Sequence, residues 1–470
     1  MSTNVGLPMA RLWPSLLLWL DGHGMETSTL PVEPREIPGA GYGLVAVRHI
    51  PPATPIFTVP ASALLNRDTL QPHYSPNPVL SGTQLISLHL LIYRPIDHLP
   101  STDPLFGPYI SVLPTSFHAH PLTWLWKERI ERNANSVESH LLALLPPRVV
   151  RDLERVARTF YADWDKVYTY LQEHSYVQAR MSYRPAEAPI SDVVLQQNFL
   201  WAWLNVNTRC IYHRLRKSQS DPDNMTLCPI LDFANHTAQS TPLLMPRNVT
   251  NVAPGKKGRE DLTFFSPEDT WAAPGQELFL KYGAHSNCTL FVEYGFLTRA
   301  TERELLRGSA QADVDVGQAI ERLIEGKGNA GVWMKDWLEA EGNWSIHTSP
   351  APAHPSYRLI TTLRLYHVLG ADSDLPENPD EVLDEWRKTT LGEREMISEQ
   401  NEALWKATLS CICNIIIREA EAGVAQVERR ASECTVDWEN WMYENIEMLW
   451  QEELYTAKAV VRSIEEGVQF

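Results

Sequence analysis

The sequence belongs to an acidic, globular chain. It has 470 residues, 44% of them hydrophobic, and a formal net charge of −17. Length and hydrophobic content predict about two to four domains with sizeable cores, and the 16 tryptophans and 34 prolines exclude a coiled coil or a disordered chain. The negative charge excludes bulk duplex DNA as a direct partner, because only a basic surface displaces the counterions of DNA.

The cysteines and the N-terminal segment bear on the compartment. No two cysteines have the CxxC spacing of a zinc site, so we expect no metal and interpret them as reduced, mostly buried thiols of an intracellular protein. The apolar segment at residues 12–20 is too short to span a bilayer and is followed by no cleavage site of small residues. We therefore expect a cytoplasmic or nuclear protein without membrane contact. The six cysteines are Cys210, Cys228, Cys288, Cys411, Cys413 and Cys434.

The N-terminal part of the chain combines one helix with short strands. Residues 12–20 predict a short amphipathic helix. The glycine-rich stretch GAGYGLVAV at residues 39–47 leads into a strand, and we expect no long strand before it. A dinucleotide fingerprint needs a strand, then glycines, then a helix, so this is neither a Rossmann loop nor a P-loop. Residues 56–60 and 63–66 are further predicted β segments between Pro and Gly turns.

The middle of the chain, from about residue 81 to residue 191, has a helical pattern. Apolar residues recur there at spacings of three and four, which is typical of one buried helix face. A second stripe of this kind follows. The first stripe comprises Leu153, Val156, Phe160, Trp164, Val167 and Leu171, and the second comprises Phe199, Trp203, Val206 and Cys210.

Strands return before a C-terminal helical region. Residues 262–265 and 277–280 predict two strands, separated by an Ala-Pro-Gly turn at residues 273–275. After about residue 297 the pattern is helical again. Its two clearest stripes are Trp405, Leu409, Ile412 and Ile416, and Leu359, Leu363 and Tyr366.

Two stretches carry the candidate chemistry. GxSxG, HExxH and GxxxxGK[ST] are all absent from the sequence, which removes the commonest hydrolase, metalloprotease and nucleotide signatures. The first stretch is CPILDFANHT at residues 228–237, and the second is GQELFLKYGAHSNCTLFVEYGF at residues 275–296. Taken singly, Asn235-His236 could be a loop with a satisfied histidine and Tyr282 an ordinary strand tyrosine. Their order after the glycine-rich turn is more specific.

This order resembles the SET-domain protein methyltransferases, in the branch of the Rubisco large-subunit lysine methyltransferase and the fungal ribosomal-protein lysine methyltransferases. The resemblance covers nearly the whole chain, including residues 106–130, WAWLNVNTRCIY at residues 201–212 and PSYRLITTLRLYHV at residues 355–368. It implies an α+β SET fold of short strands with a knot-like C-terminal segment. The implied domains are residues 1–80 with the first part of SET, a helical insertion at 81–194, the second part of SET at 195–298, and a helical substrate-binding domain at 299–470.

The resemblance also implies S-adenosylmethionine as methyl donor, without a metal. Carried over residue by residue, Ala40, Gly41 and Tyr42 form the cofactor turn, where glycine allows a close backbone approach. The catalytic tyrosine is Tyr282. The remaining cofactor residues are Arg209, Asn235, His236, Tyr294, Gly295 and Phe296, and the substrate residues are Asp232 and Tyr294. Two departures are Ala40, where many relatives have a charged residue, and Lys281, where a small or apolar residue is common.

Three functions follow as alternatives. The first is a lysine methyltransferase acting on a non-histone protein, with a ribosomal protein or translation factor as the favoured substrate class and a monomeric enzyme. The second is a histidine methyltransferase, since a histidine acceptor has a near-neutral pKa and needs less desolvation. The third is a non-catalytic binding module with an idle SET pocket. Calorimetry with S-adenosylmethionine distinguishes this module from an enzyme.

Overall fold

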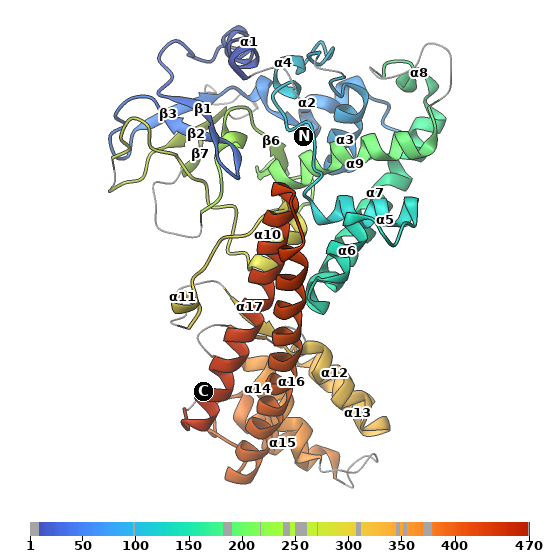
Figure 1. The fold of residues 1–470 in the computed structure, drawn as a ribbon, viewed down its shortest axis with the longest axis vertical. Coiled ribbons are helices and arrows are strands. Elements are labelled where there is room, and N and C mark those ends of the chain that lie inside the picture. Colours follow the sequence, from blue (N-terminus) through green and yellow to red (C-terminus); the bar gives the residue numbers. More distant parts are fainter. Residues whose placement is uncertain are drawn as a thin grey trace. The chain divides into compact units, whose positions relative to one another are not determined.

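The computed structural model describes residues 9–96, 99–181, 190–216, 218–237, 245–249, 261–269, 271–306, 312–344, 348–350, 355–369, 378–468 and 470 (Figure 1). The chain divides into two compact units. The first comprises residues 1–133, 153–284 and 292–295, and the second comprises residues 134–152, 285–291 and 296–470. The domain limits that the sequence suggests at residues 80, 194 and 298 stay a prediction.

The first unit opens with α1 (Met9–Gly22), which contains the predicted helix at residues 12–20 and extends it at both ends. Leu16 and Leu20 are fully buried on one face, as expected for an amphipathic helix. The indole of Trp19 donates a hydrogen bond to the carbonyl of Leu105 at 3.0 Å. This contact ties α1 to the start of the helical insertion.

A β-hairpin carries the glycine-rich stretch. β1 (Val32–Ile37) pairs antiparallel with β2 (Gly41–Ala46). The expectation that no long strand precedes the glycines is wrong, since the six-residue β1 does so. Its sequence is VEPREI, and these polar residues mask the strand pattern. Gly39 and Gly41 have φ angles of +78° and +75°, in the region that side chains disfavour. The glycines make the hairpin turn, and the exclusion of a Rossmann loop holds because β2, not a helix, follows them.

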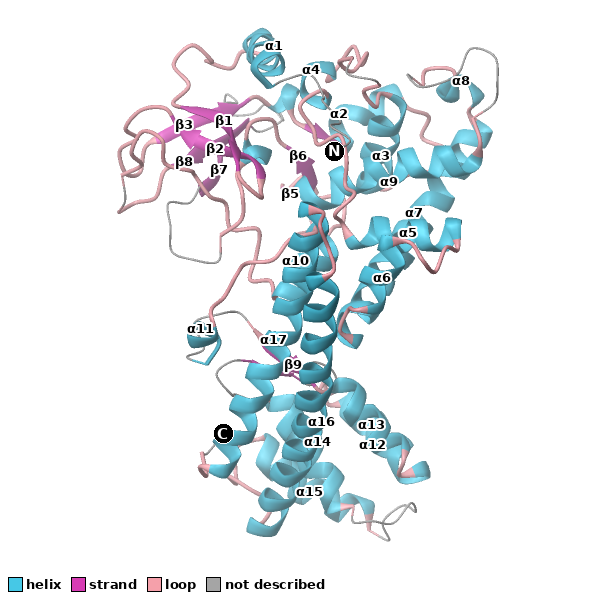
Figure 2. Cartoon of the chain, in the orientation of Figure 1, coloured by secondary structure: helices cyan, strands magenta, loops and turns pink. Residues whose placement is uncertain are grey.

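The strands form small antiparallel sheets (Figure 2). β3 (Pro55–Val59) and β7 (Met245–Val249) both pair with β8 (Asp261–Phe265). Phe57 and Phe264 pack across the first pair, with ring centroids 4.9 Å apart. The predicted strands at residues 56–60 and 262–265 are confirmed to within a residue or two.

A second three-stranded sheet joins distant parts of the chain. β4 (Leu65–Asn66) and β5 (Ile211–Tyr212) flank β6 (Met225–Leu227). The predicted strand at residues 63–66 is wrong in its first half, where η1 (Ala61–Ala63) forms a 3-10 turn. Short helical turns, α2 (Arg67–Leu70) and η2 (Gln71–His73), follow β4.

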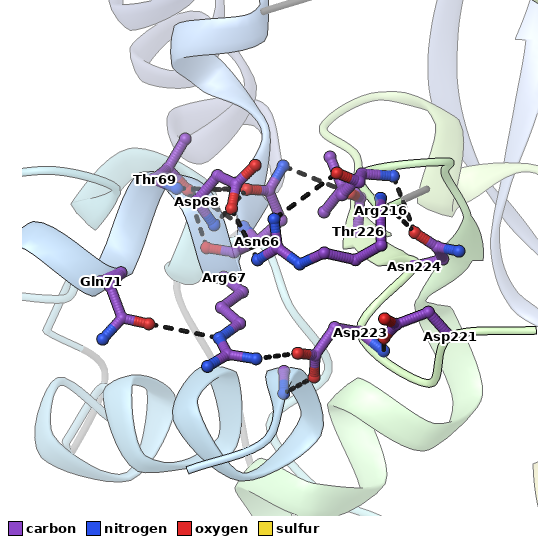
Figure 3. Close-up of polar contacts among 12 residues, drawn as sticks. Asn66, Arg67, Asp68, Thr69, Gln71, Arg216, Asp221, Asp223, Asn224 and Thr226 are labelled. Atoms are coloured by element: carbon purple, nitrogen blue, oxygen red, sulfur yellow. Dashed lines mark hydrogen bonds and ion pairs between the residues drawn. The ribbon is translucent and has the colours of Figure 1, made fainter. Parts of the chain in front are cut away.

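Charged side chains fasten this sheet to α2 (Figure 3). Arg67 on α2 forms an ion pair with Asp223, whose other carboxylate oxygen accepts from the Gly82 amide at 2.5 Å. Arg216 pairs with Asp68 at 2.8 Å. Because Asp223 is 7% exposed, its charge is held by these partners rather than by water.

The helical pattern predicted for residues 81–191 is confirmed. The apolar stripe from Leu153 to Leu171 is buried along α7, and Phe199, Trp203 and Val206 are buried on α9. Cys210 lies just beyond the end of α9 as its C-cap. The helices are α3 (Gly82–Ile92), α4 (Gly107–Ile110), α5 (Pro121–Glu131), α6 (Val137–Ala143), α7 (Pro147–Glu173), α8 (Ser175–Gln178) and α9 (Asp192–Arg209).

Residues 277–280 do not form the regular strand that their pattern predicts. They make isolated bridges instead, with Glu277 opposite Val45 and Leu280 parallel to His236. The Leu278 amide donates to the Leu44 carbonyl at 2.7 Å. The segment thus pairs with two different partners within four residues, and alternation alone cannot reveal such a change of partner.

The described residues of the second unit form helices and one two-stranded antiparallel sheet of β9 (Asp313–Asp315) and β10 (Thr348–Pro350). α16 and α17 pack along each other, and a Cβ at Gly423 would lie 2.8 Å from the indole nitrogen of Trp450 and closer still to its ring. The helices are α10 (Asn287–Tyr294, which ends in the first unit), α11 (Glu302–Leu306), α12 (Gly317–Glu325), α13 (Gly328–Ala340), α14 (Tyr357–Val368), α15 (Pro379–Thr390), α16 (Glu399–Ser432) and α17 (Asp437–Glu465).

One hydrophobic core joins α12 to α17, and both predicted C-terminal stripes face it. Its members include Trp405, Leu409, Leu359 and Leu363, all nearly inaccessible to solvent. Trp386 on α15 is fully buried in the same core. Together with the sheets of the first unit, these helices confirm the α+β class. None of the described helices is long and apolar enough to cross a membrane, and all six cysteines are free thiols.

Buried carboxyl groups lie beside this core. Asn287, at the start of α10, donates to Oε1 of Glu452 on α17. Burial raises the pKa of Glu452 from 4.5 to about 8, although the Asn287 hydrogen bond and the Arg148 charge oppose the shift. Arg148 itself bonds to Asp313 at 2.5 Å. The folded chain therefore holds a proton on Glu452 at neutral pH.

This proton makes stability depend on pH. Above pH 4.5 the unfolded chain releases the proton that folded Glu452 keeps. The free energy of unfolding is therefore highest, as far as Glu452 is concerned, below pH 4.5, and it falls as the pH rises to about 8. We expect Glu452→Gln, which keeps the acceptor for Asn287, to raise the midpoint of thermal unfolding at pH 8 and to leave it nearly unchanged at pH 5. Glu465→Gln, at an exposed position of α17, is the control. A gain of equal size at both pH values would contradict the assignment.

Candidate functional site

The two predicted catalytic stretches meet in the first unit. Residues 235–237 lie alongside residues 280–282: the Leu280 amide donates to the Asn235 carbonyl at 2.9 Å, and the Thr237 amide donates to the Leu280 carbonyl at 3.2 Å. A 3-10 turn, η3 (Leu231–Phe233), leads into this pairing. Before it, Ile230 has a φ of +69°, a costly conformation for a branched side chain. The fold thus brings together residues separated by more than forty positions.

Tyr282 stands at the centre of the site. Its amide donates to Nδ1 of His236 at 3.1 Å, and its hydroxyl donates to the Ala234 carbonyl at 2.9 Å. Burial raises the pKa of Tyr282 to about 12, so its hydroxyl is neutral at physiological pH. Its ring lies 5.1 Å from that of His236 and 5.3 Å from that of Tyr294. The three predicted residues form one aromatic wall with a fixed hydroxyl.

Two residues that the sequence did not suggest hold the end of α10. The Glu293 carbonyl, next to Tyr294, accepts from Nδ2 of Asn207 at 2.9 Å and from Nε2 of His120 at 3.3 Å. Nδ1 of His120 accepts from the Leu122 amide, so Nε2 carries the proton. Burial lowers the pKa of His120 to about 4, which keeps it neutral.

Gly295 closes against the same histidine. Its φ is +81°, and a Cβ there would lie 2.9 Å from Cδ2 of His120. Both the backbone angle and the contact require glycine at this position. Phe296, the last residue of the predicted closing segment, falls in the second unit, so its role at the site stays a prediction.

Asn235 has an acidic partner that the sequence analysis did not name. Its Nδ2 donates to Oε1 of Glu277 at 2.7 Å and to the Tyr42 carbonyl at 3.4 Å. Glu277 fills the space over Gly43, where a Cβ would lie 2.7 Å from Cγ1 of Ile37 and closer still to Oε1 of Glu277. A glycine inside a strand often marks such a close approach, and Gly43 was the signal that could have revealed Glu277.

The glycine-rich turn lies beside this contact and is open to solvent. Ala40 and Gly41 are exposed, and the Ala40 amide donates to the Ile37 carbonyl at 3.0 Å. Tyr42 is 39% exposed and meets Phe233 edge to face, with centroids 6.4 Å apart. Backbone groups at this turn are thus accessible to a ligand that Asn235 also reaches.

Arg209 and Asp232 form an ion pair in which the carboxylate is buried and the arginine is partly exposed. NH1 of Arg209 donates to the Asp232 carbonyl at 2.6 Å and lies 3.4 Å from Oδ2, which also accepts from the Tyr109 hydroxyl at 3.1 Å. Burial raises the pKa of Asp232, while Arg209 and Tyr109 oppose that shift. Nε of Arg209 and Oδ1 of Asp232 are buried without a hydrogen-bond partner, so a ligand or water has polar atoms to satisfy here.

The donors and acceptors of the site suit an amino-acid-like cofactor. The unpartnered Nε of Arg209 suits a carboxylate, and the oxygens of Asn235 and Glu277 suit an ammonium group. Among the described residues, none of the His, Cys, Asp and Glu side chains gather into a group that could hold a metal ion.

Replacing Gly43 by alanine tests this geometry. The added methyl group would push the Glu277 carboxylate away from Asn235, so we expect S-adenosylmethionine to bind about tenfold more weakly. Gly22→Ala, at a position with nothing within 4 Å, is the matched control. Isothermal titration calorimetry gives both affinities. An unchanged affinity in Gly43→Ala would mean that the Glu277 carboxylate does not contribute to cofactor binding.

Comparisons with known proteins report on the whole chain. The sequence matches no family model. It is 25% identical to SET domain-containing protein 4 of Mus musculus, covering 87% of this chain and 82% of that protein. It is 25% identical to ribosomal lysine N-methyltransferase set11 of Schizosaccharomyces pombe, covering 66% of this chain and 64% of that protein. The fold matches the SET domain of LSMT, solved with lysine and AdoHcy, with a TM-score of 0.62, 17% identity and coverage of 98% and 92%.

Fold and relatives point to one class of protein. Over most of its length the chain is similar to SET-domain proteins, among them a ribosomal lysine N-methyltransferase, and its fold is that of the SET domain of LSMT. The resemblance in its motifs is thereby confirmed across nearly the full chain.

Proposed function

We propose that this protein is an S-adenosylmethionine-dependent lysine N-methyltransferase that modifies a non-histone protein, with a ribosomal protein as the favoured substrate class. The observation that carries the proposal is the meeting of Asn235, His236, Tyr282 and Tyr294 around one aromatic wall. Relatives named as ribosomal lysine N-methyltransferases support the acceptor.

The residues of the site favour transfer to a neutral amine. When bound, S-adenosylmethionine supplies an electrophilic methyl group. A free lysine amine has a pKa of about 10.4, and burial between aromatic side chains such as those of Tyr282 and Tyr294 favours its neutral form. The Tyr282 hydroxyl and the Ala234 carbonyl, held 2.9 Å apart, provide oxygens that steady a methyl group by weak C–H···O contacts.

Positioning provides the rest of the rate. Asn235, Arg209 and the turn at Ala40–Tyr42 hold the cofactor in this proposal, and Gly295 with Tyr294 closes the lysine channel. Asp232 orients Arg209 from behind. Because the site needs no metal and no covalent intermediate, alignment of amine, methyl and sulfur supplies much of the acceleration.

Charge supports a basic substrate. The net charge of −17 attracts basic proteins over long range, and ribosomal proteins are a basic class. As part of the same proposal, the enzyme acts in the cytoplasm or nucleus, where such substrates are made and assembled.

Labelled methyl transfer tests the proposal. The enzyme and tritiated S-adenosylmethionine are added to ribosomal and soluble fractions from cells that lack this protein, and the labelled band is identified by mass spectrometry. We expect methyl-lysine in a ribosomal protein. Methyl-histidine would replace the lysine assignment, and label confined to soluble proteins would exclude the ribosomal substrate. If calorimetry shows no binding of S-adenosylmethionine, the protein is a binding module rather than an enzyme.

A further inference from the structure

A cavity lies in the first unit among residues that the methyl-transfer site does not use. It encloses about 470 Å³, a volume suited to a small organic molecule. Its wall combines aromatic rings, two histidines and one arginine, and none of the residues that line it is acidic. The lining residues are His73, Tyr74, His89, Tyr93, Pro104, Leu105 and Arg180.

A hydrogen-bonded chain of three side chains underlies one wall. Nε2 of His89 lies 2.9 Å from Oδ2 of Asp103, and Nδ1 of His89 lies 2.8 Å from the hydroxyl of Tyr74. Oδ2 of Asp103 also accepts from the Phe106 amide at 2.7 Å. His89 is 1% exposed, Asp103 5% and Tyr74 7%. A buried acid–histidine pair contributes little stability that apolar residues could not supply, so its place beside a cavity points to a ligand.

The bonding of this chain fixes what the cavity offers. A carboxylate only accepts, so Nε2 of His89 donates to Asp103. Nδ1 of His89 is then left to share a hydrogen bond with the Tyr74 hydroxyl, whose oxygen keeps a lone pair free. The Tyr74 oxygen therefore presents lone pairs, and acts as an acceptor, on the side of the cavity.

The other polar wall carries positive charge. Arg180 is exposed, hydrogen-bonds the Tyr93 hydroxyl and lies over the Tyr176 ring, 5.9 Å from its centroid. An arginine held in this way suits a carboxylate, which it can bind through two parallel hydrogen bonds. The rings of Tyr93 and His89, with centroids 5.0 Å apart, offer a surface for a flat apolar body.

We propose that this cavity binds a small aromatic carboxylate that carries a hydroxyl or amino group at its far end. The carboxylate pairs with Arg180, the ring packs against the Tyr93 and His89 wall, and the far donor bonds to the Tyr74 oxygen. Because Arg180 and Tyr74 take no part in the methyl-transfer site, this proposal stands or falls separately from the proposed enzyme activity.

Three probes of matched shape test the proposal on the full chain by isothermal titration calorimetry. 4-Hydroxybenzoate carries both polar ends, benzoate lacks the hydroxyl, and 4-hydroxybenzamide lacks the charge. We expect 4-hydroxybenzoate to bind about tenfold or more tightly than either of the others, because each lost group leaves a partner unpaired. Equal affinity for the three probes, or no binding at about 1 mM of any of them, overturns the proposal.

Two variants assign the ends of the ligand. Arg180→Ala is expected to weaken the binding of 4-hydroxybenzoate about tenfold and to leave the affinity for 4-hydroxybenzamide unchanged. Tyr74→Phe is expected to abolish the preference for 4-hydroxybenzoate over benzoate, while the affinity for benzoate itself stays the same. Arg158→Ala, at an exposed arginine of α7, is the matched control. Circular dichroism verifies that each variant is folded, and an equal effect of Arg180→Ala and Arg158→Ala contradicts the proposal.

Discussion

Replacing Tyr282 by phenylalanine is expected to lower kcat for methyl transfer by about 10²–10³-fold, the size of effect seen when one preorganised polar group is removed from an active site. The hydroxyl, held by the Ala234 carbonyl at 2.9 Å, is lost while the ring stays between His236 and Tyr294. Since the amide of Tyr282, not its hydroxyl, bonds to His236, binding of S-adenosylmethionine should change little.

Kinetics and calorimetry on the same preparations check this prediction. Tyr168→Phe is the matched control, because the Tyr168 hydroxyl on α7 donates to Asp192 at 3.1 Å, away from the site. Turnover in Tyr282→Phe equal to that of the control would remove Tyr282 from the catalytic role. A parallel loss of cofactor affinity would make it a binding residue instead.

Replacing Trp386 by alanine is expected to lower the free energy of unfolding by about 3–5 kcal/mol, the usual cost of a large cavity in a core. Trp386 is fully buried among α14, α15 and α16 residues, and its indole donates to the Thr361 carbonyl at 2.9 Å. The variant loses both the packing and this hydrogen bond.

Urea unfolding followed by far-ultraviolet circular dichroism measures the change. Trp271→Ala, at a tryptophan that is 61% exposed, should lower the free energy of unfolding only slightly. Trp386→Phe should cause a loss between those of the two alanine variants, because phenylalanine keeps most of the side-chain volume. A loss in Trp386→Ala no greater than that in Trp271→Ala would mean that this core does not stabilise the fold.

The sequence predicted the parts of the fold that carry a periodic signal. The stripes on α7, α9, α14 and α16 repeat over several turns, so each of many residues supports the same helix. Residues 277–280 alternate like a strand but bridge to both Val45 and His236. β1 was missed because its polar residues hide the alternation. Strand pairing depends on the partner, which a local pattern does not contain.

The candidate site was predicted through motifs and not through periodicity. Asn235, His236 and Tyr282 were identified because they stand in a recognisable order, and the structure brings them together. Glu277 and His120 were missed because each acts through one contact with a residue far along the chain. The Asp103–His89–Tyr74 chain was missed as well, since single polar residues carry no periodic signal.

The close approach at Gly43 limits how the sequence of this protein can vary. A methyl group at position 43 has no room while glutamate occupies position 277, and a shorter side chain at 277 would leave Asn235 with only the more distant of its two acceptors, the Tyr42 carbonyl at 3.4 Å. Substitutions at positions 43 and 277, which lie more than two hundred residues apart, are therefore expected to occur together. Among diverging descendants of this chain, covariation between them would record the contact that joins these two distant segments.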